Sequence, residues 1–95
     1  MATFFMFGKY GSEAALQEAS ADRTRQAVGA IRKLGGEVQA MYALLGEHDL
    51  ALIVELPGAE EAMKASLTLS TLTGISFSTA AAVPVENFDN LLKEI

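Results

Sequence analysis

The positions of the apolar residues predict four β-strands. The first, TFFMFGK, is apolar on both faces, as a central strand is, the second and third are mostly apolar, and in the last Ile75, Phe77 and Thr79 alternate with Ser76, Ser78 and Ala80. Glycine, proline or short polar segments separate the strands from their neighbours. The predicted strands span residues 3–9, 37–45, 49–56 and 75–83.

Apolar residues three and four positions apart predict two long helices, at residues 21–34 and 59–73. Ser20 is placed to cap the first helix, and Gly35-Gly36 ends it, with one glycine in the left-handed conformation. Gly74 ends the second helix. The stripe of the second helix that faces the core is predicted to be Ala59, Ala62, Met63, Ser66, Leu67, Leu69, Ser70 and Thr73.

Beyond Pro84 the pattern predicts a short amphipathic helix. Residues 12–19 fit a loop or a loose helical turn. With no linker, repeat or low-complexity segment, residues 1–95 are expected to form a single domain. The apolar face of the C-terminal tail comprises Val85, Phe88, Leu91, Leu92 and Ile95.

This order of elements predicts an α+β, ferredoxin-like βαββαβ fold. With right-handed crossovers it gives an antiparallel four-stranded sheet with two helices on one face and a short C-terminal helix. The other face is left uncovered, and an apolar patch of a few hundred Å² is expected to have a partner. The simplest partner is a second copy, which would give a homodimer that resembles a dimeric α/β barrel. Further assembly into a higher oligomer stays open. The predicted dimer interface comprises Phe5, Met41, Leu45 and Ile53.

The second and third strands are predicted to form a hairpin with its tip at Gly46–Asp49. If Leu44 pairs with Leu50, then Tyr42 faces Leu52 and one face of the hairpin is wholly apolar. In this register Met41 belongs to the other face, which also carries Ile53.

Composition and charge exclude several classes of function. The chain has seven Lys and Arg against twelve Asp and Glu, a net charge of −5, and therefore has no basic stripe for nucleic acid. No apolar run reaches the roughly 20 residues of a membrane span, and the start of the chain reads as a strand, not a signal peptide. The absence of cysteine excludes disulfides and cysteine nucleophiles, and a cytoplasmic location is expected.

The candidate chemistry gathers at the hairpin tip, where Glu47, His48 and Asp49 follow Gly46. His48 could serve as a base, a ligand or a pH-sensitive contact, but a lone histidine on a turn is usually just solvated. Asp49 is expected to accept backbone N–H bonds or to form a structural pair with Arg23.

Any small ligand is expected at the edge of the sheet near this tip. An anion could approach backbone N–H groups and a protonated histidine, whereas the acidic pair favours a cation or an amine, and both alternatives stay open. No catalytic residue, metal or cofactor is predicted. The predicted ligand-binding residues are Lys9, Tyr10, Gly46, Glu47, His48 and Asp49.

Several segments together resemble the GYD-domain family over essentially the whole chain. They are Phe7-Gly8-Lys9-Tyr10, Leu34-Gly35-Gly36-Glu37-Val38, Gly46-Glu47-His48-Asp49-Leu50 and the C-terminal Ala82–Phe88 stretch. The family's Gly-Tyr-Asp triplet matches here at Gly46 and Asp49, with His48 where the family has tyrosine. Its recurrent arginine at the start of the first helix matches Arg23. The resemblance implies a small protein without an established activity.

The hairpin is also similar to that in the effector-binding domain of leucine-responsive regulators, although this chain lacks their DNA-binding helix-turn-helix. The resemblance implies at most a stand-alone sensor half, and it names no ligand. A homo-oligomeric ligand-binding or assembly module is the favoured interpretation. The alternative is a small dimeric-barrel oxygenase or haem-degrading enzyme, against which the single histidine on a turn and the lack of tryptophan weigh.

Overall fold

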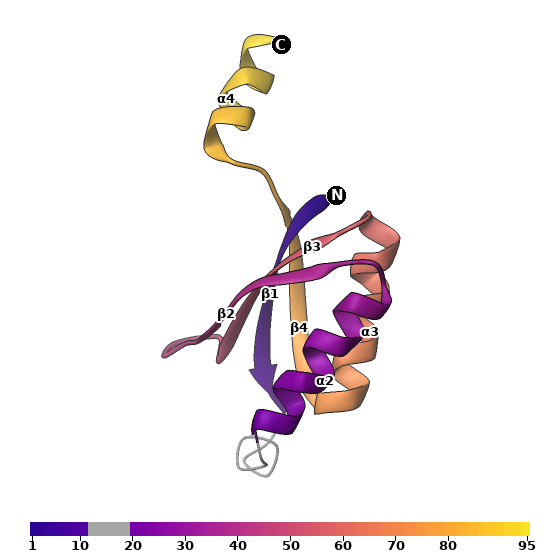
Figure 1. Ribbon diagram of the computed structural model, residues 1–95. Coiled ribbons are helices and arrows are strands. Elements are labelled where there is room, and N and C mark those ends of the chain that lie inside the picture. The colour runs from indigo at the N-terminus through magenta and orange to yellow at the C-terminus, as the bar shows by residue number, and fades with distance from the viewer. Residues whose placement is uncertain (12–19) are drawn as a thin grey trace.

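The computed structural model describes residues 1–11 and 20–95 and confirms the ferredoxin-like βαββαβ order (Figure 1). The predicted loop or turn at residues 12–19 lies outside the described residues, and so does the side chain of the proposed cap, Ser20. The elements are β1 (Ala2–Tyr10), α2 (Ser20–Lys33), β2 (Glu37–Ala43), β3 (Leu50–Leu56), α3 (Ala59–Thr73), β4 (Ile75–Ala82) and α4 (Val85–Lys93).

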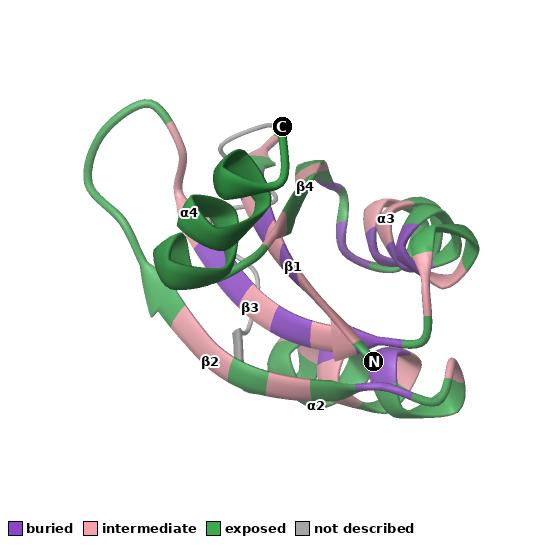
Figure 2. Ribbon diagram, turned by 90° about the horizontal axis from the view of Figure 1, so that it is seen from above, coloured by how far each residue is buried: buried purple, intermediate pink, exposed green. Residues whose placement is uncertain are grey.

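The four strands form one antiparallel sheet in the order β2-β3-β1-β4, and α2 and α3 cover one of its faces (Figure 1). The core lies between this face and the two helices, and the buried segments of β1 and β3 line its floor (Figure 2). The largest fully buried side chains are Met6, Ile31, Leu52, Val54, Leu56 and Leu69.

Both long helices end at glycine, as predicted. Gly35 has a φ of 83°, its N–H donates to Arg32 O at 3.0 Å, and the Gly36 N–H donates to Ile31 O at 3.0 Å. These two bonds form a Schellman motif. Gly36 is needed for a second reason, because a Cβ there would overlap the carbonyl oxygen of Glu55. Gly74 ends α3 with a φ of 70°.

The predicted register of the hairpin is wrong by one residue. Met41 pairs with Leu52 and Tyr42 with Ala51, because Leu44 lies opposite Asp49 at the loop, where the Leu44 N–H donates to Asp49 O, and not opposite Leu50. A bulge between Val38 and Ala40 shifts the ladder once more, so that Val38 pairs with Val54. Met41 therefore faces the helices and packs against the core instead of lying on the uncovered face. Its predicted place in an interface on that face is corrected: Ala40 and Tyr42 lie there.

The predicted core stripe of α3 is only partly right. Ala62, Leu69 and Thr73 are buried, as is Ala65, which the prediction left out. Met63 and Leu67 are 67% and 71% exposed. Small alanines let the helix lie close to the sheet, and the two larger apolar side chains of the wide stripe are turned outward.

The C-terminal helix α4 projects beyond the end of the sheet, and none of its nine residues is buried (Figures 1 and 2). The radius of gyration is 14.3 Å, whereas a compact chain of this length has about 12.4 Å. Among the described residues no helix is both long and apolar enough to cross a membrane.

Candidate functional site

The end of β1 meets the β2–β3 hairpin tip, and backbone hydrogen bonds to Asp49 hold them together. The Asp49 N–H donates to Gly8 O at 2.8 Å, and its carbonyl accepts from Leu44 N–H at 2.8 Å. Its carboxylate accepts from Tyr10 N–H at 2.9 Å. Asp49 thus accepts a backbone N–H bond, the first of the two roles expected from its place after a turn.

Tyr10 lies between the two residues of the predicted ion pair. Asp49 holds its backbone, and the Arg23 guanidinium carbon of α2 lies 5.6 Å from the centre of its ring. An arginine at this distance over an aromatic face is held by a cation–π interaction. Arg23 and Asp49 therefore both contact Tyr10, and their direct pairing stays a prediction.

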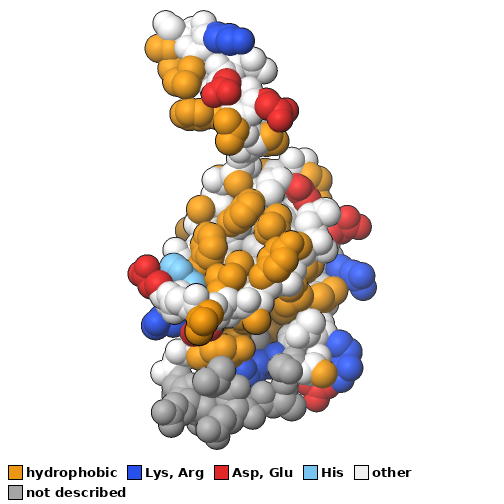
Figure 3. Space-filling view, turned by 90° about the vertical axis from the view of Figure 1, so that its left-hand side faces the viewer, with side chains coloured by type: hydrophobic (Ala, Val, Ile, Leu, Met, Phe, Trp, Pro, Cys, Tyr) orange, Lys and Arg blue, Asp and Glu red, His pale blue; other side chains and the backbone are white. Residues whose placement is uncertain are grey.

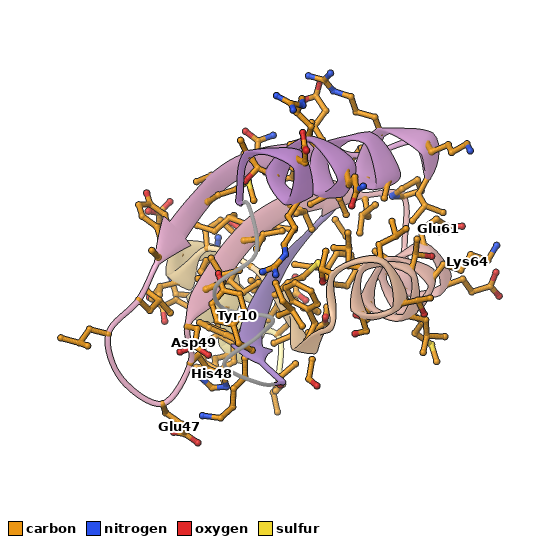
Figure 4. All side chains as sticks on the ribbon, turned by 90° about the horizontal axis from the view of Figure 1, so that it is seen from below. Tyr10, Glu47, His48, Asp49, Glu61 and Lys64 are labelled. Atoms are coloured by element: carbon orange, nitrogen blue, oxygen red, sulfur yellow. The ribbon has the colours of Figure 1, made fainter. Side chains whose placement is uncertain are left out.

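Lys9 and Glu47 form a second link between β1 and the hairpin tip. The Lys9 ammonium group donates to the backbone carbonyl of Glu47 at 3.0 Å. The Glu47 carboxylate is not used in this bond, and the side chain points away from the sheet at the outer end of the loop (Figure 4). At Gly46 the φ of 152° favours glycine, and nothing lies within 4 Å of where a Cβ would be.

His48 is half-buried, so the expectation of a merely solvated histidine is corrected. Its ring lies 5.2 Å from that of Phe7 at 41°, and the Phe7 ring is 6.4 Å from that of Phe5. These contacts place His48 at the end of a row of aromatic rings. Figure 4 shows Tyr10, His48 and Asp49 together at this corner of the molecule.

A groove of about 280 Å³ opens beside this row, on the uncovered side of the sheet. It combines one ammonium group and one imidazole with two hydroxyl groups on β4 and the backbone carbonyl of Glu47, so it offers partners to anions and cations alike. Of the six predicted ligand-binding residues it brings together three. Its walls include Phe7, Lys9, Glu47, His48, Ser76 and Ser78.

A second, smaller cavity of about 80 Å³ lies on the helix-covered side of β1 and was missed by sequence reasoning. Tyr10 and Arg23 line it together with apolar residues that include Ala27 and Met41. The four-residue spacing of Arg23 and Ala27 on α2 was visible in the sequence. The contribution of Met41 was not, because it follows from the register of the hairpin, in which Met41 pairs with Leu52.

No metal site is evident at this corner. Among residues 1–11 and 20–95, no group of three His, Asp or Glu side chains is placed to hold a metal ion. The arrangement of Lys9, His48 and the hydroxyl groups of Ser76 and Ser78 is suited to holding a small polar molecule by hydrogen bonds and charge.

The fold resembles that of two solved structures, one of which is a regulatory protein. The leucine response regulatory protein (LrpA) of Mycobacterium tuberculosis matches 87% of this chain and 51% of its own, with a TM-score of 0.62 and 12% identity. A second solved structure, of a point mutant, matches 87% of this chain and 50% of its own, with a TM-score of 0.62 and 13% identity. The chain thus spans about half the length of these structures, and at such low identity the likeness concerns the fold alone.

A search of curated proteins gives no match. The model of the GYD domain, in contrast, matches residues 3–92, which include every residue that lines the groove. The chain therefore belongs to the GYD domain family.

Proposed function

We propose that this GYD domain acts as a homodimeric module that binds a small molecule beside its dimer interface. The observation that carries the proposal is the uncovered face of the sheet, on which apolar side chains gather (Figure 3). A soluble domain rarely exposes a contiguous apolar sheet face without a partner.

The centre of this face is built by β1 and β3. Phe5 pairs directly with Ile53, and Phe7 with Ala51, so their side chains lie next to one another. Phe5, Phe7 and Ile53 are each partly exposed. At the end of the face that carries the N-terminus, Thr3 donates to the Glu55 carboxylate at 2.6 Å, which satisfies part of that charge within the chain. A second sheet could thus pack here on an apolar centre with a polar rim.

The groove at the hairpin tip borders this centre, because Phe7 belongs to both. A second copy packed over Phe5 and Ile53 would form one more wall of the groove. Ligand binding and dimerisation would then stabilise each other, since each would order the same aromatic side chains.

The dimer is tested by analytical ultracentrifugation at micromolar concentration. Wild type is expected to be a dimer, and Ile53→Asp a monomer, because a charge would be buried without a partner. Thr68→Asp, which places the same charge at an exposed position on α3, is the matched control and should stay dimeric. Circular dichroism shows whether each variant is folded. A monomeric wild type would refute the proposal.

Ligand binding is tested by titrating amino acids and divalent cations into labelled protein and mapping chemical shifts. Perturbations are expected at Lys9, His48 and Ser76. Changes confined to α2 and α3 would contradict this location. If only anions, or only cations, perturb Lys9, His48 and Ser76, the result decides which charge the groove binds.

A further inference from the structure

The C-terminal helix α4 has an apolar face that the described residues leave exposed. Val85 is 73% exposed, and Phe88, Leu91 and Leu92 are each 52% exposed. Isolated helices shorter than about 12–15 residues are marginal in water, so a nine-residue helix needs packing on another surface. Because the described residues around α4 leave its apolar face exposed, we look for that surface on another molecule.

The connection to β4 keeps α4 at its own end of the sheet. It consists of Val83 and Pro84, both exposed, and two residues span at most about 7 Å. Pro84 has φ −56° and ψ 146°, which is an extended conformation, and its ring restricts the φ angle to this region. The helix cannot reach around to the outer side of α2 and α3.

A matching apolar element projects at the other end of the same side. Next to the hairpin tip, Leu45 is fully exposed, and Leu44 and Tyr42 are 40% and 56% exposed. In Figure 1 the tip and α4 both lie on the side of the sheet away from α2 and α3, α4 at the top and the tip near the bottom. Figure 3 shows the apolar sheet face between them.

We propose that α4 is an arm exchanged between two copies, in which each α4 packs its apolar face on the partner's hairpin tip. The inference rests on the dimer proposed above. A two-fold axis perpendicular to the strands, between the packed faces, turns one copy end for end and brings each arm over the other's tip. The two-fold axis thus produces two equivalent contacts, each between Phe88 of one copy and Leu45 of the other.

The area of the interface favours this arrangement. Four strands of seven paired residues present roughly 440 Å² of flat area, against about 800 Å² of surface per partner in a stable interface. One arm about 13.5 Å long and roughly 10 Å wide, together with the surface under the partner's arm, brings the total to roughly 700 Å². The exchange therefore brings the interface close to the usual size.

The charges of α4 favour a protein surface over a membrane. Its polar side carries Glu86 and Asp89 against Lys93, and Glu94 follows at its end. Helices that lie on anionic membranes carry Lys and Arg on the polar face instead.

Disulfide trapping tests the contact directly, because the chain has no cysteine of its own. We expect a Leu45→Cys chain and a Phe88→Cys chain to form a mixed disulfide when combined under oxidation. Each variant alone should stay reduced, since the two-fold axis keeps like positions at opposite ends. Thr68→Cys combined with Phe88→Cys is the control for random collision and should also stay reduced.

The contribution of the arm is measured by the dimer dissociation constant. Phe88→Asp is expected to raise it at least tenfold, whereas Asn90→Asp, which adds the same charge on the polar side, should leave it within twofold. A wild-type dimer with no Leu45–Phe88 disulfide and no effect of Phe88→Asp would overturn the exchange and leave the sheet-face dimer intact. A disulfide to Thr68→Cys would also overturn it, and a monomeric wild type would overturn both proposals.

Discussion

The carboxylate of Asp49 accepts a hydrogen bond from the backbone N–H of Tyr10 at 2.9 Å, across 39 positions of the sequence. Tyr10 is the last residue of β1, and the Asp49 N–H in turn donates to Gly8 O. One residue at the hairpin tip therefore continues the sheet beyond its regular ladder. This tie fixes the place of the strand end that borders both the groove and the inner cavity.

Asp49→Ala should lower the free energy of unfolding by about 1–3 kcal/mol, because it leaves the partly buried Tyr10 N–H without its acceptor. Asp49→Asn should cost less, since the amide keeps one acceptor oxygen. Glu47→Ala, whose side chain is exposed, should change the value by no more than about 0.5 kcal/mol. Urea unfolding of the three variants measures this, and equal losses for Asp49→Ala and Glu47→Ala would contradict the role of Asp49.

Gly8→Ala should destabilise the protein by about 1–3 kcal/mol through overpacking. A Cβ at Gly8 would lie 2.9 Å from Ile75 Cγ2 and 2.9 Å from Phe77 Cε1, closer than carbon atoms pack. The side chains of β4 would have to move, and the loss is measured by thermal or urea unfolding.

Gly29→Ala is the matched control and should act in the opposite direction. Gly29 lies inside α2, and nothing is within 4 Å of where its Cβ would be. Alanine should therefore stabilise the helix by roughly 0.5–1 kcal/mol. A loss of stability here, similar to that of Gly8→Ala, would show that crowding is not the cause at Gly8.

The order of the elements and the ends of both long helices could be predicted from the sequence, because they depend on local chemistry. Apolar spacing sets the period of each element, and Gly35 and Gly74 adopt the left-handed conformations that end α2 and α3. The family was recognised from short segments spread along the chain, and the match over residues 3–92 confirms it.

The register of the hairpin could not be predicted in this way. It depends on where the loop closes, with Leu44 opposite Asp49, and on a bulge between Val38 and Ala40, and the local sequence predicts neither. One residue of slip exchanges the faces of β2. For this reason Met41 was assigned to the wrong face and the cavity beside Arg23 was missed.

The contact of His48 was also hidden from the sequence, because Phe7 is far away along the chain and only the sheet brings the rings together.

His48→Ala should lower the free energy of unfolding by about 0.5–1.5 kcal/mol, the usual value of such an aromatic pair. His48→Phe should keep most of the stability, since it keeps a ring on Phe7. Equal destabilisation by both substitutions in urea unfolding would mean that the imidazole nitrogens matter more than the packing.

The pairing of Arg23 with Asp49 is tested by a double-mutant cycle of Arg23→Ala and Asp49→Ala. We expect a coupling energy of about 1 kcal/mol, since interacting neighbours give 0.5–3 kcal/mol. Repeating the cycle with Tyr10→Leu separates two routes, because this change removes the ring under Arg23 and keeps the N–H that Asp49 accepts. Coupling that survives the change indicates a direct ion pair, and coupling that disappears indicates that the tyrosine ring transmits it. Energies additive within about 0.3 kcal/mol would show that the two residues act independently.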